Sequence, residues 1–252
     1  MQDFDSQVVL VTGGSSGIGL ATAEEFQARG ARVVITGRRQ DALDAAAATL
    51  GENVTAVRTD VADGAEMDAL FELIRTRFGR LDHVIANAGS GHHSQLGSIT
   101  DEEFDATIAT NVKGILNSVQ KALPLLGAGA SITIVGSTGS IHPPFAMSLY
   151  GGAKAAVRNY VRSWIQDIKG SGVRMNVLSP GVADTESLRI ALTRAFGADR
   201  LDEQLSHMGE GNPLGRIGST GEIAKAIAFL SSADASFIHG VELFVDGGMA
   251  QV

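Results

Sequence analysis

The sequence contains no cysteine among its 252 residues. Disulfide frameworks and thiolate chemistry are therefore excluded, and a reducing compartment is compatible with the composition. No apolar run approaches the ~18 residues of a membrane span, and the N-terminal segment from Met1 to Ser6 is acidic rather than basic. We therefore expect a cytoplasmic protein that has neither a signal peptide nor a membrane segment.

An excess of positive charge is also lacking. The chain has 28 acidic and 20 basic residues, a formal net charge of -8. No basic stripe is available for phosphate backbones, so nucleic acid is not an expected partner. The chain has no Pro/Ser-rich linker and no internal repeat, and 44% apolar residues suffice for one large core. We expect a single domain over residues 1–252.

Short runs rich in valine, isoleucine and leucine alternate with longer helical stretches. Expected strands cover 8–11, 32–36, 54–59, 83–86, 131–135, 174–178 and 242–245. Expected helices cover 18–29, 40–50, 64–79, 101–126, 148–169 and 220–232. Thr100 and Glu103 have the spacing of a capping box. Near-continuous apolar strands are typical of parallel sheets covered on both faces. The pattern predicts an α/β, Rossmann-type doubly wound parallel sheet of about seven strands, with its ligand crevice at the carboxyl ends.

A glycine-rich turn directly follows the first expected strand. It reads Thr12-Gly13-Gly14-Ser15-Ser16-Gly17-Ile18-Gly19. Glycines allow the backbone to turn sharply and to approach a pyrophosphate, and the N-terminus of the next helix offers unpaired N–H groups. This turn is therefore a candidate phosphate site.

The second expected strand ends in Gly37-Arg38-Arg39 rather than in an acidic residue. An acidic side chain there would accept hydrogen bonds from the ribose 2′-hydroxyl of NAD, whereas a guanidinium pairs with a 2′-phosphate. Gly37 leaves room for that phosphate, and Ser15 is placed to add a hydroxyl. The pattern favours NADP(H) over NAD(H); the alternative is that both arginines are solvated surface charges.

Tyr150 and Lys154 stand four residues apart, and Ser137 precedes the tyrosine by thirteen residues at the end of an apolar run. On a helix this spacing places the ammonium beside the phenol. An adjacent cation is expected to lower the pKa of Tyr150, and Ser137 supplies a hydroxyl to hold a substrate oxygen. Taken alone, the pair is also compatible with an ordinary amphipathic helix.

Together these residues resemble the short-chain dehydrogenase/reductase family, in its short single-domain branch, over the whole chain. The resemblance rests on the glycine motif, Asp60-Val61, Asn87-Ala88-Gly89, Asn111, Ser137, Tyr150-x-x-x-Lys154 and Pro180-Gly181 with Thr185. One departure is the pair Gly151-Gly152, where relatives often carry serine and alanine. The resemblance implies a nicotinamide cofactor, Tyr150 as acid or base, Lys154 as its pKa modulator and ribose anchor, and Ser137 as the carbonyl holder.

The resemblance also implies roles for further residues. Asp60 and Val61 would flank the adenine, Asn87, Ala88 and Gly89 would line the cofactor groove, and Pro180, Gly181, Val182 and Thr185 would hold the carboxamide. Asn111 would bind a water that links Lys154 to solvent, or else satisfy local backbone inside a helix. Relatives are usually homotetramers in which the C-terminal tail, here Phe244 to Val252, packs between subunits.

Two segments bear on the substrate. By the same resemblance, Ser137, Tyr150 and the segment that starts at Ile141 and His142 would form the wall of the substrate pocket, and residues 185–212, including Leu188, would form a lid. Their apolar side chains favour a hydrophobic or bulky ketone or secondary alcohol over a sugar, or else only anchor the lid on the core. A metal site at the adjacent His92 and His93 is not expected, because no carboxylate cluster accompanies them.

The sequence thus predicts an NADP(H)-dependent carbonyl reductase or secondary-alcohol dehydrogenase. A 3-oxoacyl thioester reductase is the alternative within oxidoreductases, although the net charge shows no basic surface for an acidic carrier protein. A cofactor-binding redox sensor on the same fold is a third possibility. Presence of Ser137, Tyr150 and Lys154 argues against that sensor.

Overall fold

A computed structural model describes residues 3–91 and 93–251. Seven parallel strands form one sheet in the order β3-β2-β1-β4-β5-β6-β9. The strands are β1 (Val8–Val11), β2 (Arg32–Gly37), β3 (Val54–Arg58), β4 (Leu81–Ala86), β5 (Leu126–Val135), β6 (Arg174–Pro180) and β9 (Glu242–Val245). The expected doubly wound parallel sheet is confirmed, and strand order reverses between β1 and β4.

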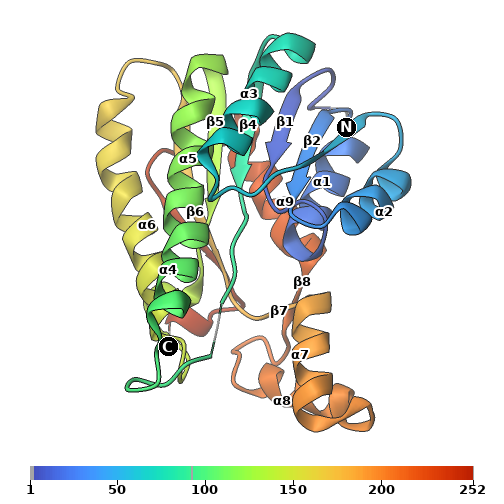
Figure 1. The fold of residues 1–252 in the computed structure, drawn as a ribbon, viewed down its shortest axis with the longest axis vertical. Coiled ribbons are helices and arrows are strands. Elements are labelled where there is room, and N and C mark those ends of the chain that lie inside the picture. The colour runs from blue at the N-terminus through green and yellow to red at the C-terminus, as the bar shows by residue number, and fades with distance from the viewer. Residues whose placement is uncertain (1–2, 92, 252) are drawn as a thin grey trace.

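Helices cover both faces of this sheet (Figure 1). One apolar core packs α3 (Gly64–Phe78), α5 (Gly114–Ala122) and α6 (Ser148–Asp167) against the strands. The opposite core packs α1 (Gly17–Ala28), α2 (Gln40–Leu50) and α9 (Thr220–Ser231). Fully buried valine and leucine alternate between the two cores along β1, which explains why its run is continuously apolar.

The region expected as one helix over 101–126 is divided. It consists of α4 (Asp101–Ile108), a π-helical turn over Ala109–Lys113, α5 and a short 3₁₀ turn over Leu123–Leu125. The expected capping box is confirmed, because Thr100 accepts from the N–H of Glu103 and Glu103 accepts from that of Thr100. A π-helical turn inserts one residue into the helical repeat, which a periodicity pattern does not specify.

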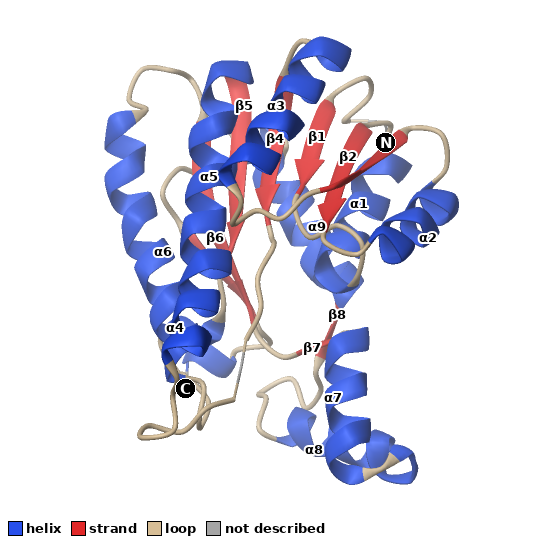
Figure 2. Cartoon of the chain, in the orientation of Figure 1, coloured by secondary structure: helices blue, strands red, loops and turns tan. Residues whose placement is uncertain are grey.

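Two helices that were not expected, α7 (Glu186–Phe196) and α8 (Leu201–Glu210), lie beyond the carboxyl ends of the strands (Figure 2). They follow β7 (Ala183–Asp184), and the chain returns through β8 (Gly218–Ser219). These two short strands pair in parallel, so the start and end of the excursion are fastened together. The excursion coincides with the segment expected as a lid.

Candidate active site

The turn between β1 and α1 has the backbone that its glycines permit. Gly13 and Gly17 have φ values of 66° and 56°, which side-chain-bearing residues rarely adopt. A Cβ atom on Gly19 would lie 2.1 Å from the Gly13 carbonyl oxygen. Ser16 begins α1 without a side-chain capping bond, which leaves the first N–H groups of the helix to a ligand. The turn therefore fits an anionic phosphate.

Thr12 and Asn87 fasten this turn to the end of β4. The Thr12 hydroxyl accepts hydrogen bonds from the N–H groups of Asn87 (3.0 Å) and Ala88 (3.1 Å). In return, the Asn87 amide donates to the carbonyl oxygens of Thr12 (3.0 Å) and Gly13 (3.2 Å). These contacts place Asn87 and Ala88 at the centre of the switch point between β1 and β4.

A cleft of about 340 Å³ lies over the glycine turn. Its lining includes fifteen of the expected cofactor residues: Gly13, Ser15, Ser16, Gly17, Ile18, Gly19, Gly37, Arg38, Arg39, Asp60, Val61, Asn87, Ala88, Gly89 and Thr185. Three threonines and a serine that we did not anticipate also line it: Thr36, Thr59, Thr110 and Ser187. All three threonines directly precede anticipated residues, but a lone hydroxyl gives no sequence signal of its own.

The end of β2 has space that only glycine provides. A Cβ atom on Gly37 would lie 2.9 Å from the Ser15 Oγ atom, so the serine hydroxyl occupies the room beside the strand end. Arg38 and Arg39 follow on the exposed surface and border the cleft. Glycine, hydroxyl and guanidinium groups therefore meet at this border of the cleft.

A second cavity, of about 640 Å³, adjoins the cleft and shares Ile18, Asn87, Gly89, Thr185 and Ser187 with it. It brings together side chains from four separate segments. Of the expected residues it is lined by Ser137, Tyr150, Lys154, Pro180, Gly181, Val182, Thr185 and Leu188. The Thr185 hydroxyl begins α7 by accepting from the Leu188 N–H at 3.2 Å.

Ser137 and Lys154 are held by the backbone at the end of β5. Ser137 begins a 3₁₀ turn over Thr138–Ser140, and its Oγ atom accepts from the Gly139 N–H at 3.0 Å. The buried Lys154 ammonium donates to the Val135 carbonyl oxygen at 2.7 Å. The hydroxyl and the ammonium are therefore anchored to the same strand end.

Asn111 is completely buried within the π-helical turn. Its amide donates to the carbonyl oxygens of Ser90 (2.8 Å) and Thr107 (3.0 Å), and its Oδ1 atom accepts from the Ser90 N–H at 3.3 Å. A Cβ atom on Gly89 would lie 2.9 Å from this Oδ1 atom and 3.3 Å from the Lys154 Nζ atom. Asn111 thus satisfies local backbone groups, which is one of the two roles expected for it. Its Oδ1 atom and the Lys154 Nζ atom also border the same space beside Gly89.

The pKa of Tyr150 corrects one expectation. Burial raises this pKa, and the neighbouring Ser137 hydroxyl offsets the rise only in part. The Lys154 ammonium donates to the Val135 carbonyl oxygen, and its Nζ atom lies 5.7 Å from the centroid of the tyrosine ring, so burial outweighs the expected lowering. Burial also lowers the pKa of Lys154 to about 8. In this environment the phenol keeps its proton and is poised as an acid.

A second correction concerns the substrate wall. Ile141 and His142 do not line the cavity, and His142 is exposed, because the chain leaves the site after the 3₁₀ turn. Ser90, Gly91 and Met147 line it instead. Gly91 has a recognisable role, since a Cβ atom there would lie 2.9 Å from Met147 Cε and 3.3 Å from the Tyr150 ring.

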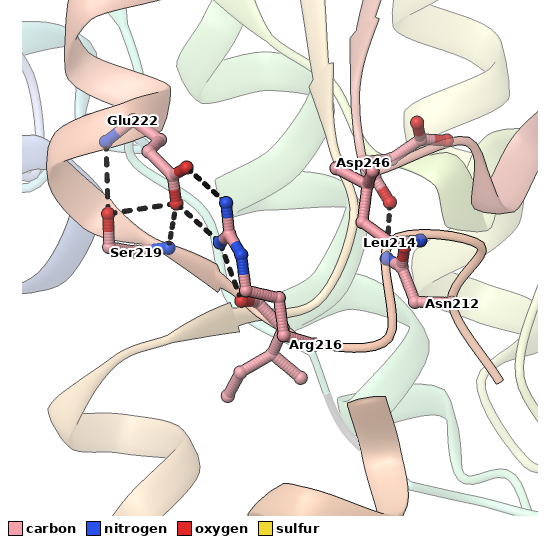
Figure 3. A network of polar contacts seen from close by, with 7 residues as sticks. Asn212, Leu214, Arg216, Ser219, Glu222 and Asp246 are labelled. Atoms are coloured by element: carbon pink, nitrogen blue, oxygen red, sulfur yellow. Dashed lines mark hydrogen bonds and ion pairs between the residues drawn. The ribbon is translucent and has the colours of Figure 1, made fainter. Parts of the chain in front are cut away.

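The return of the lid segment is anchored by two polar networks (Figure 3). The Asn212 amide donates to the Asp246 carbonyl oxygen at 2.6 Å, and its Oδ1 atom accepts from the Leu214 N–H at 2.9 Å. Arg216 makes a two-pronged ion pair with Glu222, at 2.9 and 2.7 Å. Asn212 is buried and the ion pair is exposed, so the amide is the stronger anchor.

Within residues 3–91 and 93–251, no cluster of three or more possible metal ligands is found. His92 lies outside these described residues, so the predicted absence of a His92–His93 site stays a prediction. No helix in the described part of the chain is both long and apolar enough to cross a membrane.

Comparison with known proteins identifies the family of this chain. The family described as enoyl-(acyl carrier protein) reductase matches residues 13–250. The chain belongs to the short-chain dehydrogenase/reductase family. It is 41% identical to "Oxidoreductase asL5" of Sarocladium schorii, over 100% of this chain and 99% of that protein. It is 34% identical to 3-oxoacyl-[acyl-carrier-protein] reductase FabG of Escherichia coli, over 99% and 100%.

A solved structure has a similar fold that matches the whole of this chain. Aldohexose dehydrogenase from Thermoplasma acidophilum matches with a TM-score of 0.92 at 29% identity, covering 100% of this chain and 96% of that one. The chain is therefore an oxidoreductase of the family, which works with a nicotinamide cofactor.

Proposed function

We propose that the protein transfers a hydride between NADP(H) and a hydrophobic or bulky ketone or secondary alcohol. The observation that carries the proposal is the convergence of Ser137, Tyr150 and Lys154 on one cavity that adjoins the glycine-turn cleft. NADPH bound there would supply the hydride. The protein's own groups would hold the substrate oxygen and move the proton.

The side chains divide this work by their chemistry. Tyr150 donates its phenolic proton to the carbonyl oxygen during reduction, because burial keeps that proton on the phenol. Ser137 donates a hydrogen bond to the same oxygen and orients it. Lys154 contributes a fixed positive charge in a buried site and serves as the ribose anchor. Asn111 lies beside Lys154 and is assigned the water that links the ammonium to solvent.

Preference for NADP(H) is supported by the end of β2. Arg38 and Arg39 border the cleft, Gly37 and Ser15 leave a polar recess, and no acidic side chain occupies this position. We assign Asp60 and Val61 to the adenine, and the turn Pro180–Val182 with Thr185 to the carboxamide.

The wall of the cavity supports the proposed substrate. Leu188, Met147 and Val182 contribute apolar surface, whereas Ser90 and Ser187 are the polar side chains that we did not anticipate. We take these apolar side chains to favour an apolar substrate over a polyol, which binds through several hydrogen bonds.

A 3-oxoacyl thioester reductase is the second candidate, and the whole-length similarity to FabG favours it. An acidic carrier protein would need a basic surface near the site. Residues 122–153, which include β5 and the chain leading to Tyr150, contain no arginine or lysine. This stretch therefore favours a free small molecule over a carrier-bound one.

We also propose a homotetramer. Large apolar side chains are exposed on α4, α5, α6 and α9 and in the segments that follow α5 and α9: Phe104, Leu116, Leu123, Tyr160, Phe229 and Phe237. Exposed apolar side chains grouped on helices mark association surfaces. Sedimentation of the purified chain tests this assembly.

The proposal is tested by a panel of ketones and alcohols assayed with both NADPH and NADH. Aryl or bulky alkyl ketones should oxidise NADPH, and a 3-oxoacyl thioester of pantetheine should be slower. Fastest turnover with a carrier-bound thioester would support the second candidate. Faster turnover of sugars than of apolar ketones would contradict the proposed substrate class.

A further inference from the structure

The carboxylate of Glu242 contacts three segments that carry the site. Its Oε1 atom accepts hydrogen bonds from the hydroxyls of Ser179 (2.8 Å) and Ser140 (3.3 Å). Its Oε2 atom accepts from the Arg158 guanidinium at 3.5 Å. The Glu242 side chain is only 13% exposed, so solvent screens this cluster little.

Each partner of Glu242 adjoins a site residue. Ser140 ends the 3₁₀ turn that Ser137 begins. Ser179 immediately precedes the Pro180–Val182 turn. Arg158 stands four residues after Lys154 on α6, so the two lie on the same face of that helix. One partly buried carboxylate therefore connects the chain after Ser137, the end of β6 and helix α6.

A backbone contact joins two of the same segments independently. A Cβ atom on Gly151 would lie 2.7 Å from the Gly139 carbonyl oxygen and 2.9 Å from Pro143 Cβ. The next residue, Gly152, is exposed, and a Cβ atom there would meet nothing within 4 Å. Only the first glycine of the pair is therefore required by packing. It lets the chain after Ser137 approach α6 more closely than any other residue would allow.

We propose that Glu242 and Gly151 are positioning residues, which together fix Ser137 relative to Tyr150. Neither touches the cavity. Glu242 acts through the hydroxyl of Ser140 and the guanidinium of Arg158, and Gly151 acts through the backbone of Gly139. The inference rests on the proposed function, because Ser137 and Tyr150 are the groups that would hold the substrate oxygen and give it a proton.

The two glycines provide a matched pair of variants. Gly151→Ala and Gly152→Ala each remove one glycine from the same helix, so both gain the same helical preference. Gly151→Ala should lower kcat by about 10- to 100-fold, since displacement of a catalytic group by ~1 Å costs up to about 100-fold. Gly152→Ala should leave kcat unchanged, and the affinity for NADPH should stay the same in both. Equal kcat values for the two variants would contradict the role of Gly151.

Glu242 is tested by a conservative and a disruptive change. Glu242→Gln keeps an oxygen that accepts from Ser140 and Ser179, whereas Glu242→Leu removes both contacts. The leucine variant should lose about 10-fold or more in kcat with little change in KM for NADPH. That loss should remain below the ~10²- to 10³-fold cost of deleting a donor to the substrate oxygen. The glutamine variant should recover most of the rate. Equal loss in both variants, or no loss in either, would contradict the role of Glu242.

A measurement without substrate separates this inference from the proposed function. The chain has two tyrosines, so in a Tyr160→Phe background the ultraviolet absorbance of the phenolate reports on Tyr150 alone. The Ser137 hydroxyl lowers the pKa of Tyr150, and its displacement should therefore raise that pKa. Gly151→Ala and Glu242→Leu should both move the titration to higher pH, while Gly152→Ala should not. An unmoved titration in both would overturn the inference, even if the wild-type protein reduced no ketone.

Discussion

The ammonium of Lys154 donates a 2.7 Å hydrogen bond to the carbonyl oxygen of Val135, two residues before Ser137. This bond fixes the catalytic helix to the strand that delivers the serine. The same Nζ atom lies 5.7 Å from the centroid of the Tyr150 ring. Lys154 is therefore both a buried charge and a structural tie, and its removal should affect both properties.

Lys154→Met should reduce turnover by about 10²- to 10³-fold, the usual cost of removing one fixed group that stabilises charge in the transition state. The wild-type reduction rate should also fall as pH rises through about 8, because Lys154 has a pKa of about 8 while that of Tyr150 is raised. The ammonium therefore loses its proton before the phenol does. A pH profile of kcat checks this order. If kcat of the Lys154→Met variant falls with rising pH in the same way as kcat of the wild type, this order of proton loss would be contradicted.

Arg38→Ala should weaken NADPH binding by about 10- to 100-fold, the range expected for loss of a charge-assisted hydrogen bond. NADH binding should be nearly unchanged. Arg58→Ala is the control, because Arg58 ends the neighbouring strand β3 and does not line the cleft. Titration calorimetry with both cofactors measures the difference. Tighter binding of NADH than NADPH to the unmodified protein would contradict the cofactor preference.

His83 should make the fold sensitive to acid. Its ring nitrogens lie 2.8 Å from the Ser131 hydroxyl and 2.6 Å from the Gln7 side-chain oxygen, and burial lowers its pKa from 6.5 to about 4. Because the folded state binds the proton less tightly, the stabilisation is complete above pH 6.5 and is lost as pH falls toward 4. The expected loss in the free energy of unfolding is about 3 kcal/mol.

Urea unfolding across this pH range measures the loss. His83→Gln is the control, since it has no imidazole to titrate. A wild-type stability that falls no more steeply than that of the glutamine variant would show that His83 does not carry the effect.

Asn212→Ala should loosen the lid. The change leaves the Asp246 carbonyl oxygen and the Leu214 N–H without their partner, at a cost of about 1–3 kcal/mol in stability. We expect KM for the substrate to rise more than kcat falls, because the site residues themselves stay in place. Glu222→Gln, which weakens an exposed ion pair, should change both constants little. Identical kinetics in wild type and Asn212→Ala would show that Asn212 does not anchor the lid.

Much of the fold could be predicted because each buried strand carries a run of apolar residues. Lid helices α7 and α8 were not predicted; Leu192 in α7 and Leu205 and Gly209 in α8 are their buried residues, so these helices contribute little to the core. The π-helical turn at Asn111 could not be predicted from helical periodicity either, although Asn111 itself was identified as a site residue.

Site residues could be predicted where a motif places them on one turn or helix, as with Gly13 or Tyr150. Contacts between segments that are distant in the sequence could not be predicted. The bonds from Lys154 to Val135 and from Ser140 to Glu242 join residues 19 and 102 positions apart. Their geometry depends on the packing of β5, α6 and β9, which no local pattern specifies. For the same reason, the sequence alone gave the wrong direction for the pKa of Tyr150.

In the proposed mechanism, Tyr150 exchanges the proton with the substrate oxygen. The most direct test compares NADPH oxidation by wild type and Tyr150→Phe with one reactive ketone, alongside cofactor binding to both proteins. We predict that the phenylalanine variant binds NADPH with nearly wild-type affinity but has no measurable turnover. Equal turnover in the two proteins would contradict the proposed mechanism.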